Sequence, residues 1–226
     1  MVMEEMKIAE DLKVKLASTV RKWFLREGRH FEWRKNRTPY RVFVAEFLLK
    51  RTTSKAAERI YRRFLEKYPD IHSLANADIT ELEVIFKPIG LYKQRSKGII
   101  EAAKYIESNF REEIPVDYEK LISIPHIGDY SACCILSFGM GTPVATVDSN
   151  VQRVLSRVFV TELQGDHRLK NIIHLASDLL PRDEHEIFNY GLIDLGATVC
   201  TYRKCCEKVC PLKNMCATYK NATKTL

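Results

Sequence analysis

Asp148 is a carboxylate directly before an amphipathic helix predicted from Ser149. A carboxylate can stabilise the positive charge that develops on a sugar carbon when a glycosidic bond breaks, and it can orient the attacking water. Aspartate is also a preferred N-cap residue. The residues alone favour the capping role, and the two roles are compatible.

Glu46 is a second carboxylate in unusual surroundings, inside the apolar run from Val42 to Leu49. A buried acid is unfavourable unless it faces a partner or a cavity, and such a site suits proton donation or hydrogen bonding to a ligand. The alternative is a structural glutamate paired with an arginine. Tyr130 is equally open, since it either lines a site or packs between helices.

Five of the seven cysteines lie within seventeen residues near the C-terminus: Cys200, Cys205, Cys206, Cys210 and Cys216. An odd total in a chain without a signal peptide argues against a disulfide framework. A tight cluster of this kind more often binds a metal or an iron–sulfur centre, and zinc in a four-cysteine site is the alternative to iron.

The overall composition is that of a globular protein, with 46% hydrophobic and 29% charged residues. Lysine and arginine outnumber aspartate and glutamate by 36 to 29, and this net charge of +7 suits a polyanionic partner. The uncharged stretch at residues 131–147 is too short for a membrane span. The N-terminus has no apolar signal core, so we expect a cytoplasmic protein.

Helical periodicity dominates the sequence and predicts an all-α chain with short loops. Thr38 followed by Pro39, Asp78 with Glu81, and Asp117 resemble helix starts. The expected helices cover about residues 8–26, 40–50, 54–68, 79–86, 93–110, 118–123, 129–136, 149–159, 168–180 and 184–199. The cysteine cluster is expected to end the fold.

Residues 124–128, Ile-Pro-His-Ile-Gly, form a predicted hairpin between two of these helices. Such a hairpin presents backbone N–H groups at a helix N-terminus, and these groups attract a phosphate without reading base sequence. Taken alone, it would more simply be an ordinary tight turn. It does not stand alone, because Val147-Asp148-Ser149-Asn150 follows closely.

The segment LISIPHIGDYSACCILSFGMGTPVATVDSNVQRVLSRVF resembles the helix-hairpin-helix (HhH-GPD) DNA glycosylases of the endonuclease III and adenine glycosylase superfamily. The resemblance continues in FEWRKNRTPYRVFVAEFLLKRTT, IGLYKQRSKGI and IFNYGLIDLGATVC, covers about residues 20–216, and is greatest to the archaeal thymine-DNA glycosylases that act on T·G mismatches. It implies a six-helix domain over about residues 36–145, which contains the hairpin. Residues 1–35 and 146–226 would form a second domain with the cluster, and the active cleft would lie between the two.

The resemblance implies a base excision repair enzyme whose partner is double-stranded DNA with a mismatched or damaged base, and we expect it to act as a monomer. Asp148 would face the deoxyribose C1′ atom, and Glu46 would contact the flipped base. Bifunctional members carry lysine where this chain has Tyr130, and a phenol cannot form their Schiff base with C1′. Base removal alone is therefore expected, with strand nicking absent or weak.

Three functions remain open. The first is removal of thymine or uracil opposite guanine, and the second is removal of adenine opposite guanine or oxidised guanine. Glu46 is compatible with both, whereas Tyr130 and the short segment after the cysteines favour thymine. The third is a DNA-structure-binding protein without catalysis, against which Asp148 and Glu46 both argue.

DNA contacts are expected from several loops that the resemblance covers. Arg51 is the candidate wedge for the gap left by a flipped nucleotide, although a solvated basic turn would look the same. Leu91 begins a second loop that would face the opposite strand. At His126 the family normally has glycine, so histidine is strained there if φ is positive, and it could add a phosphate contact. The full expected set is Lys50, Arg51, Thr52, Leu91, Gln94, Arg95, His126, Gly128 and Arg153.

The family holds a [4Fe–4S] cluster through Cys-x6-Cys-x2-Cys-x5-Cys, and Cys200, Cys210 and Cys216 fit that pattern. The remaining family position is Glu207 here. Cys206, one residue earlier, is the expected fourth ligand, with Cys205 as the fallback. Such a cluster would be structural and would order a basic loop against phosphates.

Overall fold

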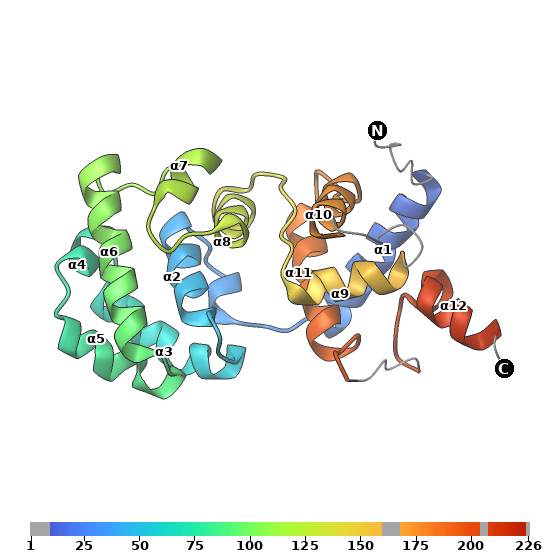
Figure 1. Cartoon of the computed structure of the whole chain (residues 1–226), viewed down its shortest axis with the longest axis horizontal. Coiled ribbons are helices and arrows are strands. Elements are labelled where there is room, and N and C mark those ends of the chain that lie inside the picture. Colours follow the sequence, from blue (N-terminus) through green and yellow to red (C-terminus); the bar gives the residue numbers. More distant parts are fainter. Residues whose placement is uncertain (1–9, 160–167, 204–207, 225–226) are drawn as a thin grey trace. The chain divides into compact units, whose positions relative to one another are not determined.

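The computed structural model describes residues 10–159, 168–203 and 208–224. Within these ranges the regular elements are helices and no β-strand occurs, so the prediction of an all-α chain is confirmed for this part of the protein (Figure 1). The chain divides into two compact units. Unit 1 comprises residues 1–29 and 143–226, and unit 2 comprises residues 30–142.

Unit 2 is built around the long helix α6 and the buried helix α2. Its core contains large side chains from several helices, including the stacked rings of Phe64 and Phe86, whose centroids are 5.5 Å apart. The α-helices are α2 (Pro39–Leu49), α3 (Ser54–Lys67), α4 (Ile71–Ala75), α5 (Ile79–Phe86), α6 (Tyr92–Phe110), α7 (Tyr118–Ser123) and α8 (Asp129–Cys134).

The predicted helix starts in unit 2 are confirmed by their capping hydrogen bonds. The Thr38 side chain accepts from the Arg41 N–H, and Pro39 occupies the first helical turn. Asp78 accepts from two backbone N–H groups at the start of α5. Asp117 accepts from the Lys120 N–H at the start of α7. These caps fix where each helix begins, and hence where its loop must turn.

Unit 1 packs α1 (Glu10–Glu27) and α9 (Ser149–Val158) against α11 (His185–Thr198). Its buried core draws on all three helices, with Leu16, Val154 and Leu195 among its members. Helices α10 (Arg168–Asp178) and α12 (Ala217–Lys224) lie against α9 (Figure 1). We had predicted that the cysteine segment ends the fold. This prediction is wrong, because α12 follows that segment. The mostly polar sequence of α12 has no apolar stripe from which it could be predicted.

The helical periodicity of the sequence does not predict two further elements of unit 2. Helix α4 has only five residues and is marked instead by a capping box between Asp70 and Ser73. A π-helical turn, Ile135–Gly139, continues α8. At its end Gly139 packs on the start of α2, where a Cβ atom would lie 2.9 Å from the Cα atom of Pro39. Glycine is thus required there by close packing.

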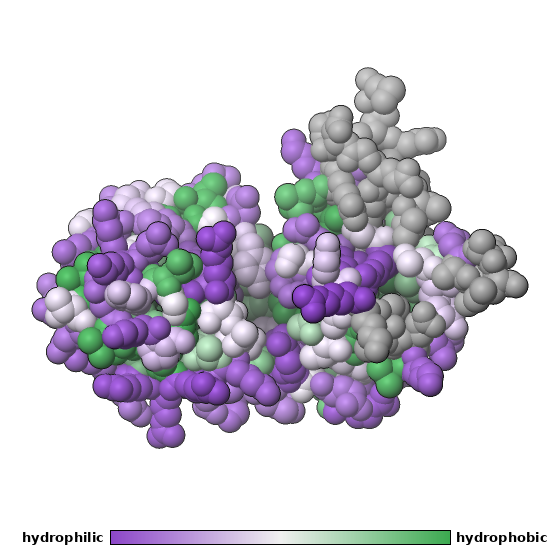
Figure 2. Space-filling model, turned by 60° about the horizontal axis from the view of Figure 1, so that its bottom comes forward, coloured by the Kyte–Doolittle hydropathy of each residue, from purple (hydrophilic) through white to green (hydrophobic). Residues whose placement is uncertain are grey.

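The coloured surface in Figure 2 is mostly hydrophilic, and its hydrophobic side chains form small separate patches. Among the described residues, no helix is both long enough and apolar enough to cross a membrane.

Candidate functional site

Asp148 lies in unit 1 as the N-cap of α9, and the predicted capping role is confirmed. Its Oδ1 atom accepts from the backbone N–H groups of Asn150 and Val151 at 2.9 and 2.8 Å. Its Oδ2 atom accepts from Nδ2 of Asn150 at 2.7 Å. Three donors fix the half-buried carboxylate, which has about four acceptor positions, so it can also face a reacting group.

Asn150 is held in turn by Arg153, whose Nη2 atom donates to Oδ1 of Asn150 at 2.7 Å. The same guanidinium donates to the carbonyl of Gly196 at 2.6 Å and to that of Cys200 at 2.7 Å. We expected Arg153 at the DNA, but these N–H groups point into unit 1. A chain of hydrogen bonds thus runs from the backbone of Cys200 to the carboxylate of Asp148.

Close packing of α11 against α9 supports this arrangement. A Cβ atom at Gly196 would lie 2.5 Å from Cβ of Asn150 and 2.8 Å from its carbonyl oxygen. Neither contact can be relieved by moving a flexible side chain. Gly196 therefore lets the two helices approach closely enough for Arg153 to reach both.

Glu46 and Tyr130 lie in unit 2 and are connected by Cys134. Glu46 is buried in α2 with 8% of its surface exposed, and Tyr130 is half-buried in the first turn of α8. The fully buried Cys134 thiol donates to the Glu46 carboxylate and accepts from the Tyr130 hydroxyl. Burial, reinforced by the Glu46 charge, raises the pKa of Cys134 well above its usual value and keeps the thiol a donor.

The hairpin between α7 and α8 is anchored by Ile124 and Ile127, which are both buried, while the intervening His126 is exposed. His126 has a φ of +65°, a conformation that costs a residue with a Cβ atom about 1–2 kcal/mol. Its Nε2 atom lies 2.7 Å from a carboxylate oxygen of Glu101. The histidine ring is thus engaged by an acid of α6, where we had expected a phosphate contact.

Gly128 is the N-cap of α8, with extended backbone angles that any residue could adopt. It is exposed, and a Cβ atom there would meet nothing within 4 Å. Neither backbone strain nor internal packing therefore explains the glycine. Open space next to a helix N-terminus is what close approach of an external phosphate group requires.

Two of the expected DNA-contacting residues, Arg51 and Leu91, share a left-handed backbone. Each has a φ of +51°, and both side chains are exposed. Arg51 follows the end of α2, and Leu91 is the N-cap of α6. Thr52 is half-buried in the first of these loops, and Gln94 is exposed in the first turn of α6.

Lys50 and Arg95 turn inward, although both were expected to contact DNA. Lys50 is half-buried, and its Nζ atom donates to the carbonyl of His126 at 2.6 Å and lies 4.1 Å from the centre of the Phe47 ring. Arg95 is buried and donates to four backbone carbonyls, those of Gly90, Phe47, Leu48 and Lys50. Burial lowers the pKa of Arg95, yet a guanidinium remains charged.

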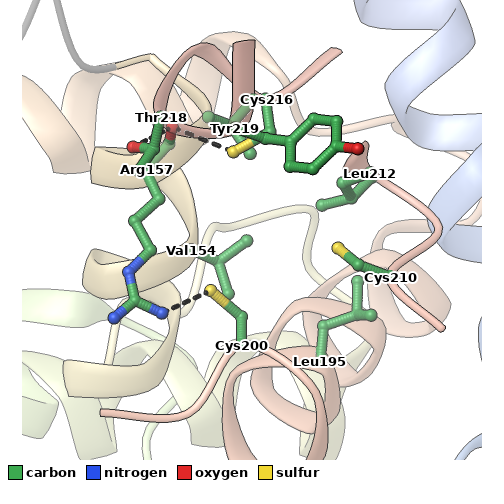
Figure 3. A pocket seen from close by; sticks show the side chains of 10 residues that line it. Val154, Arg157, Leu195, Cys200, Cys210, Leu212, Cys216, Thr218 and Tyr219 are labelled. Atoms are coloured by element: carbon green, nitrogen blue, oxygen red, sulfur yellow. Dashed lines mark hydrogen bonds between the residues drawn. The ribbon is translucent and has the colours of Figure 1, made fainter. Parts of the chain in front are cut away.

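Cys200, Cys210 and Cys216 line one cavity of about 170 Å³ in unit 1, and Figure 3 shows their sulfur atoms turned toward it. Arg157 of α9 donates to the sulfur of Cys200 at 3.2 Å, and the Cys216 thiol donates to the carbonyl of Arg157 at 3.2 Å. Three thiols and a nearby cation fit a group that needs anionic sulfur ligands. Cys205 and Cys206, our candidates for the fourth ligand, lie outside the described residues.

Three further residues contact the predicted site residues in the structure. Asn150 and Cys134 contact the predicted catalytic residues, and Arg157 contacts the predicted metal ligands. Spacing was the available signal, because Cys134 follows Tyr130 by four residues and Arg157 follows Arg153 by four. Residues four apart share one face of a helix.

The chain matches the family described as "HhH-GPD superfamily base excision DNA repair protein" over residues 44–176. A thymine-DNA glycosylase of Aeropyrum pernix is 36% identical over 84% of this chain and 86% of its own length. A thymine/uracil-DNA glycosylase of Pyrobaculum aerophilum is 34% identical over 91% of this chain and 92% of its own. The solved structure of a thermostable thymine-DNA glycosylase superposes with a TM-score of 0.89 at 29% identity, covering 95% of this chain and all of that one.

Proposed function

The chain belongs to the HhH-GPD superfamily of base excision DNA repair proteins, and we propose that it is a monofunctional DNA glycosylase that removes thymine or uracil mispaired with guanine. Its partner is double-stranded DNA, and its product is an abasic site. The relatives named as thymine and thymine/uracil glycosylases match it over most of both chains. The observation that carries the monofunctional reaction is Tyr130, because a phenol cannot form a Schiff base with C1′.

The proposed reaction begins when the target nucleotide rotates out of the duplex. Rotation costs a few kcal/mol, and less at a mismatch, because the pairing is already weak. Arg51 and Leu91 are exposed at loop positions from which side chains can fill the gap in the stack. Gly128 leaves room for a phosphate at the N-terminus of α8.

Asp148 would act on the sugar of the flipped nucleotide. As the bond between C1′ and the base nitrogen breaks, its electron pair goes to the base and positive charge grows on the sugar. The carboxylate stabilises that charge, and its three fixed donors mean that it needs no reorientation during the step. Water then adds its oxygen to C1′, and the proton that it loses balances the proton gained by the departing base.

Glu46 and Tyr130 would bind the flipped base. The Cys134 thiol hydrogen-bonds both, so it holds their side chains together on neighbouring helices. A carboxylate buried beside a thiol and a phenol offers acceptor and donor positions for the polar edge of a pyrimidine. The pocket then favours a base whose hydrogen-bonding pattern matches this set.

A panel of duplexes tests this function directly. The duplexes share one sequence and differ in a single pair: T·G, U·G, A·G, A opposite 8-oxoguanine, and the matched T·A pair. We expect T·G and U·G to yield strand breaks only after alkali, which cleaves abasic sites. Release of adenine would establish the adenine glycosylase alternative. Tight binding without release of any base would establish a non-catalytic DNA-binding protein.

We also propose that Cys200, Cys206, Cys210 and Cys216 hold a [4Fe–4S] cluster. The three described cysteines share one cavity, and the Arg157 guanidinium donates to the sulfur of Cys200. A cluster bound there would be structural, since it would tie the segment after α11 to the segment before α12.

If the cluster is bound, we expect a brown protein with broad absorbance at about 400 nm. It should contain iron and inorganic sulfide in equal amounts. Cys210→Ser should lose the colour and most of the iron, because it removes one thiolate ligand. Cys133→Ser is the matched control, since Cys133 lies in α8 of unit 2. Comparing Cys205→Ser with Cys206→Ser identifies the fourth ligand. A colourless protein with one zinc ion would contradict the proposal.

A further inference from the structure

Arg51 and Leu91 lie on separate loops of unit 2, yet each has a φ of +51°. Non-glycine residues rarely adopt this conformation, and glycine is the usual choice directly after a helix, where Arg51 stands. Strained backbone persists only where surrounding contacts hold it in place. The contacts that hold these two residues therefore determine how their side chains are presented.

The side chain of Arg95 binds the peptide group that precedes Leu91 and the peptide group that precedes Arg51. Its Nε atom donates to the carbonyl of Gly90 at 2.8 Å, and its Nη2 atom donates to the carbonyl of Lys50. A carbonyl and the amide nitrogen of the following residue lie in one rigid plane. By orienting these two planes, Arg95 restrains φ at Leu91 and at Arg51 together.

The remaining contacts tie this pair to the body of unit 2. Nη1 of Arg95 donates to the carbonyl of Phe47 at 2.6 Å and to that of Leu48 at 3.4 Å, both near the end of α2. Lys50 extends the connection to the hairpin through the carbonyl of His126 at 2.6 Å. Three loops that are distant in sequence are thus joined by two cationic side chains.

The contacts of Arg95 indicate that its main role is to orient the two loops and not to stabilise the fold. All four of its described acceptors are backbone carbonyls, and a buried charge without a carboxylate partner is a poor source of stability. A planar guanidinium has five N–H donors in fixed directions, so it can bind the carbonyls at the end of α2 and the carbonyl of Gly90 at the same time. A lysine ammonium group, with its donors on one atom, cannot span the same positions.

We propose, on the basis of the function proposed above, that Arg95 is a positioning residue that presents Arg51 and Leu91 to the two DNA strands as one preorganised pair. The pair is needed where the enzyme must separate a base from its partner and fill the space that it leaves. It is dispensable where the opposite base is missing, because there is no pairing to break and no widowed base to support.

The test compares excision of uracil opposite guanine with excision of uracil opposite a tetrahydrofuran abasic analogue, both under single-turnover conditions. For Arg95→Met, we expect the ratio of the first rate to the second to fall at least about tenfold from the wild-type ratio. A loss of folded protein would lower both rates equally and leave the ratio unchanged. Arg95→Lys should give an intermediate ratio. Arg63→Met, which removes one exposed charge from α3, should keep the wild-type ratio.

A second experiment measures the unstacking of the DNA bases and does not depend on excision. 2-Aminopurine placed next to a T·G mispair should brighten when the wild-type enzyme binds and unstacks it, and should brighten much less with saturating Arg95→Met. A wild-type ratio together with wild-type brightening in Arg95→Met would overturn the inference. Failure of the wild-type enzyme to release uracil from U·G would instead refute the proposed function.

Discussion

Asp148→Asn should lower the single-turnover rate of thymine excision from a T·G duplex by about 10²- to 10³-fold, because it removes the negative charge that stabilises the sugar in the transition state. Asparagine is as good an N-cap as aspartate, so α9 should still form. The new amide would face Nδ2 of Asn150, which now donates to Oδ2 of Asp148. This mismatch should cost about 1 kcal/mol of unfolding free energy. Quenched-flow release of the base measures the rate, and thermal unfolding measures the cost.

Asp78→Asn is the matched control for this experiment. Asp78 caps α5 through two backbone N–H groups, and its replacement removes the same charge from an exposed N-cap of unit 2. We expect its excision rate to equal that of the wild type. Fluorescence anisotropy should show that Asp148→Asn still binds mismatched DNA. Unchanged excision by Asp148→Asn would exclude the carboxylate from the chemical step.

Tyr130→Lys should convert the enzyme from base removal alone to base removal with strand nicking. A lysine amine at this position can attack C1′, displace the base and form a Schiff base, from which the strand breaks by elimination. Borohydride reduces that imine to a stable bond. The expected result is therefore a covalent protein–DNA band on a denaturing gel, together with nicks that appear without alkali.

Tyr130→Phe is the control for Tyr130→Lys, because it also removes the hydroxyl but adds no amine. It removes the hydrogen bond from Tyr130 to the Cys134 sulfur and supplies no nucleophile. It should give no trapped band and no nicks, although its affinity for the flipped base should fall. A trapped band with the wild-type protein would show that the monofunctional assignment is wrong.

Asp148 can serve both as the N-cap of α9 and as the proposed catalytic carboxylate. The sequence alone favoured an N-cap, and the structure confirms the cap with three hydrogen bonds to the carboxylate. The cap also explains why an aspartate at this place suits catalysis, because a carboxylate that is already oriented need not reorganise as charge develops. Capping and catalysis therefore draw on the same geometry.

The local signals in the sequence predicted most of the helices, because a helix start depends on residues within one turn of it. Thr38, Asp78, Asp117 and Asp148 each accept from an N–H group two or three residues away. The tight cluster of cysteines near the C-terminus indicated a metal or iron–sulfur site, and the resemblance to the family's four-cysteine pattern singled out the three described cysteines that share a cavity. Helix α4 and the π-helical turn were missed because they are too short or too irregular to set up a periodic apolar pattern.

What the tertiary structure decided is where the long polar side chains point. The resemblance led us to expect both Arg95 and Arg153 at the DNA, yet each donates to backbone carbonyls more than forty residues away in the chain. Cys134 is a fully buried core residue of α8, and it also contacts Glu46 from another helix. Such partners are set by how helices pack, and neither residue type nor local spacing carries that information.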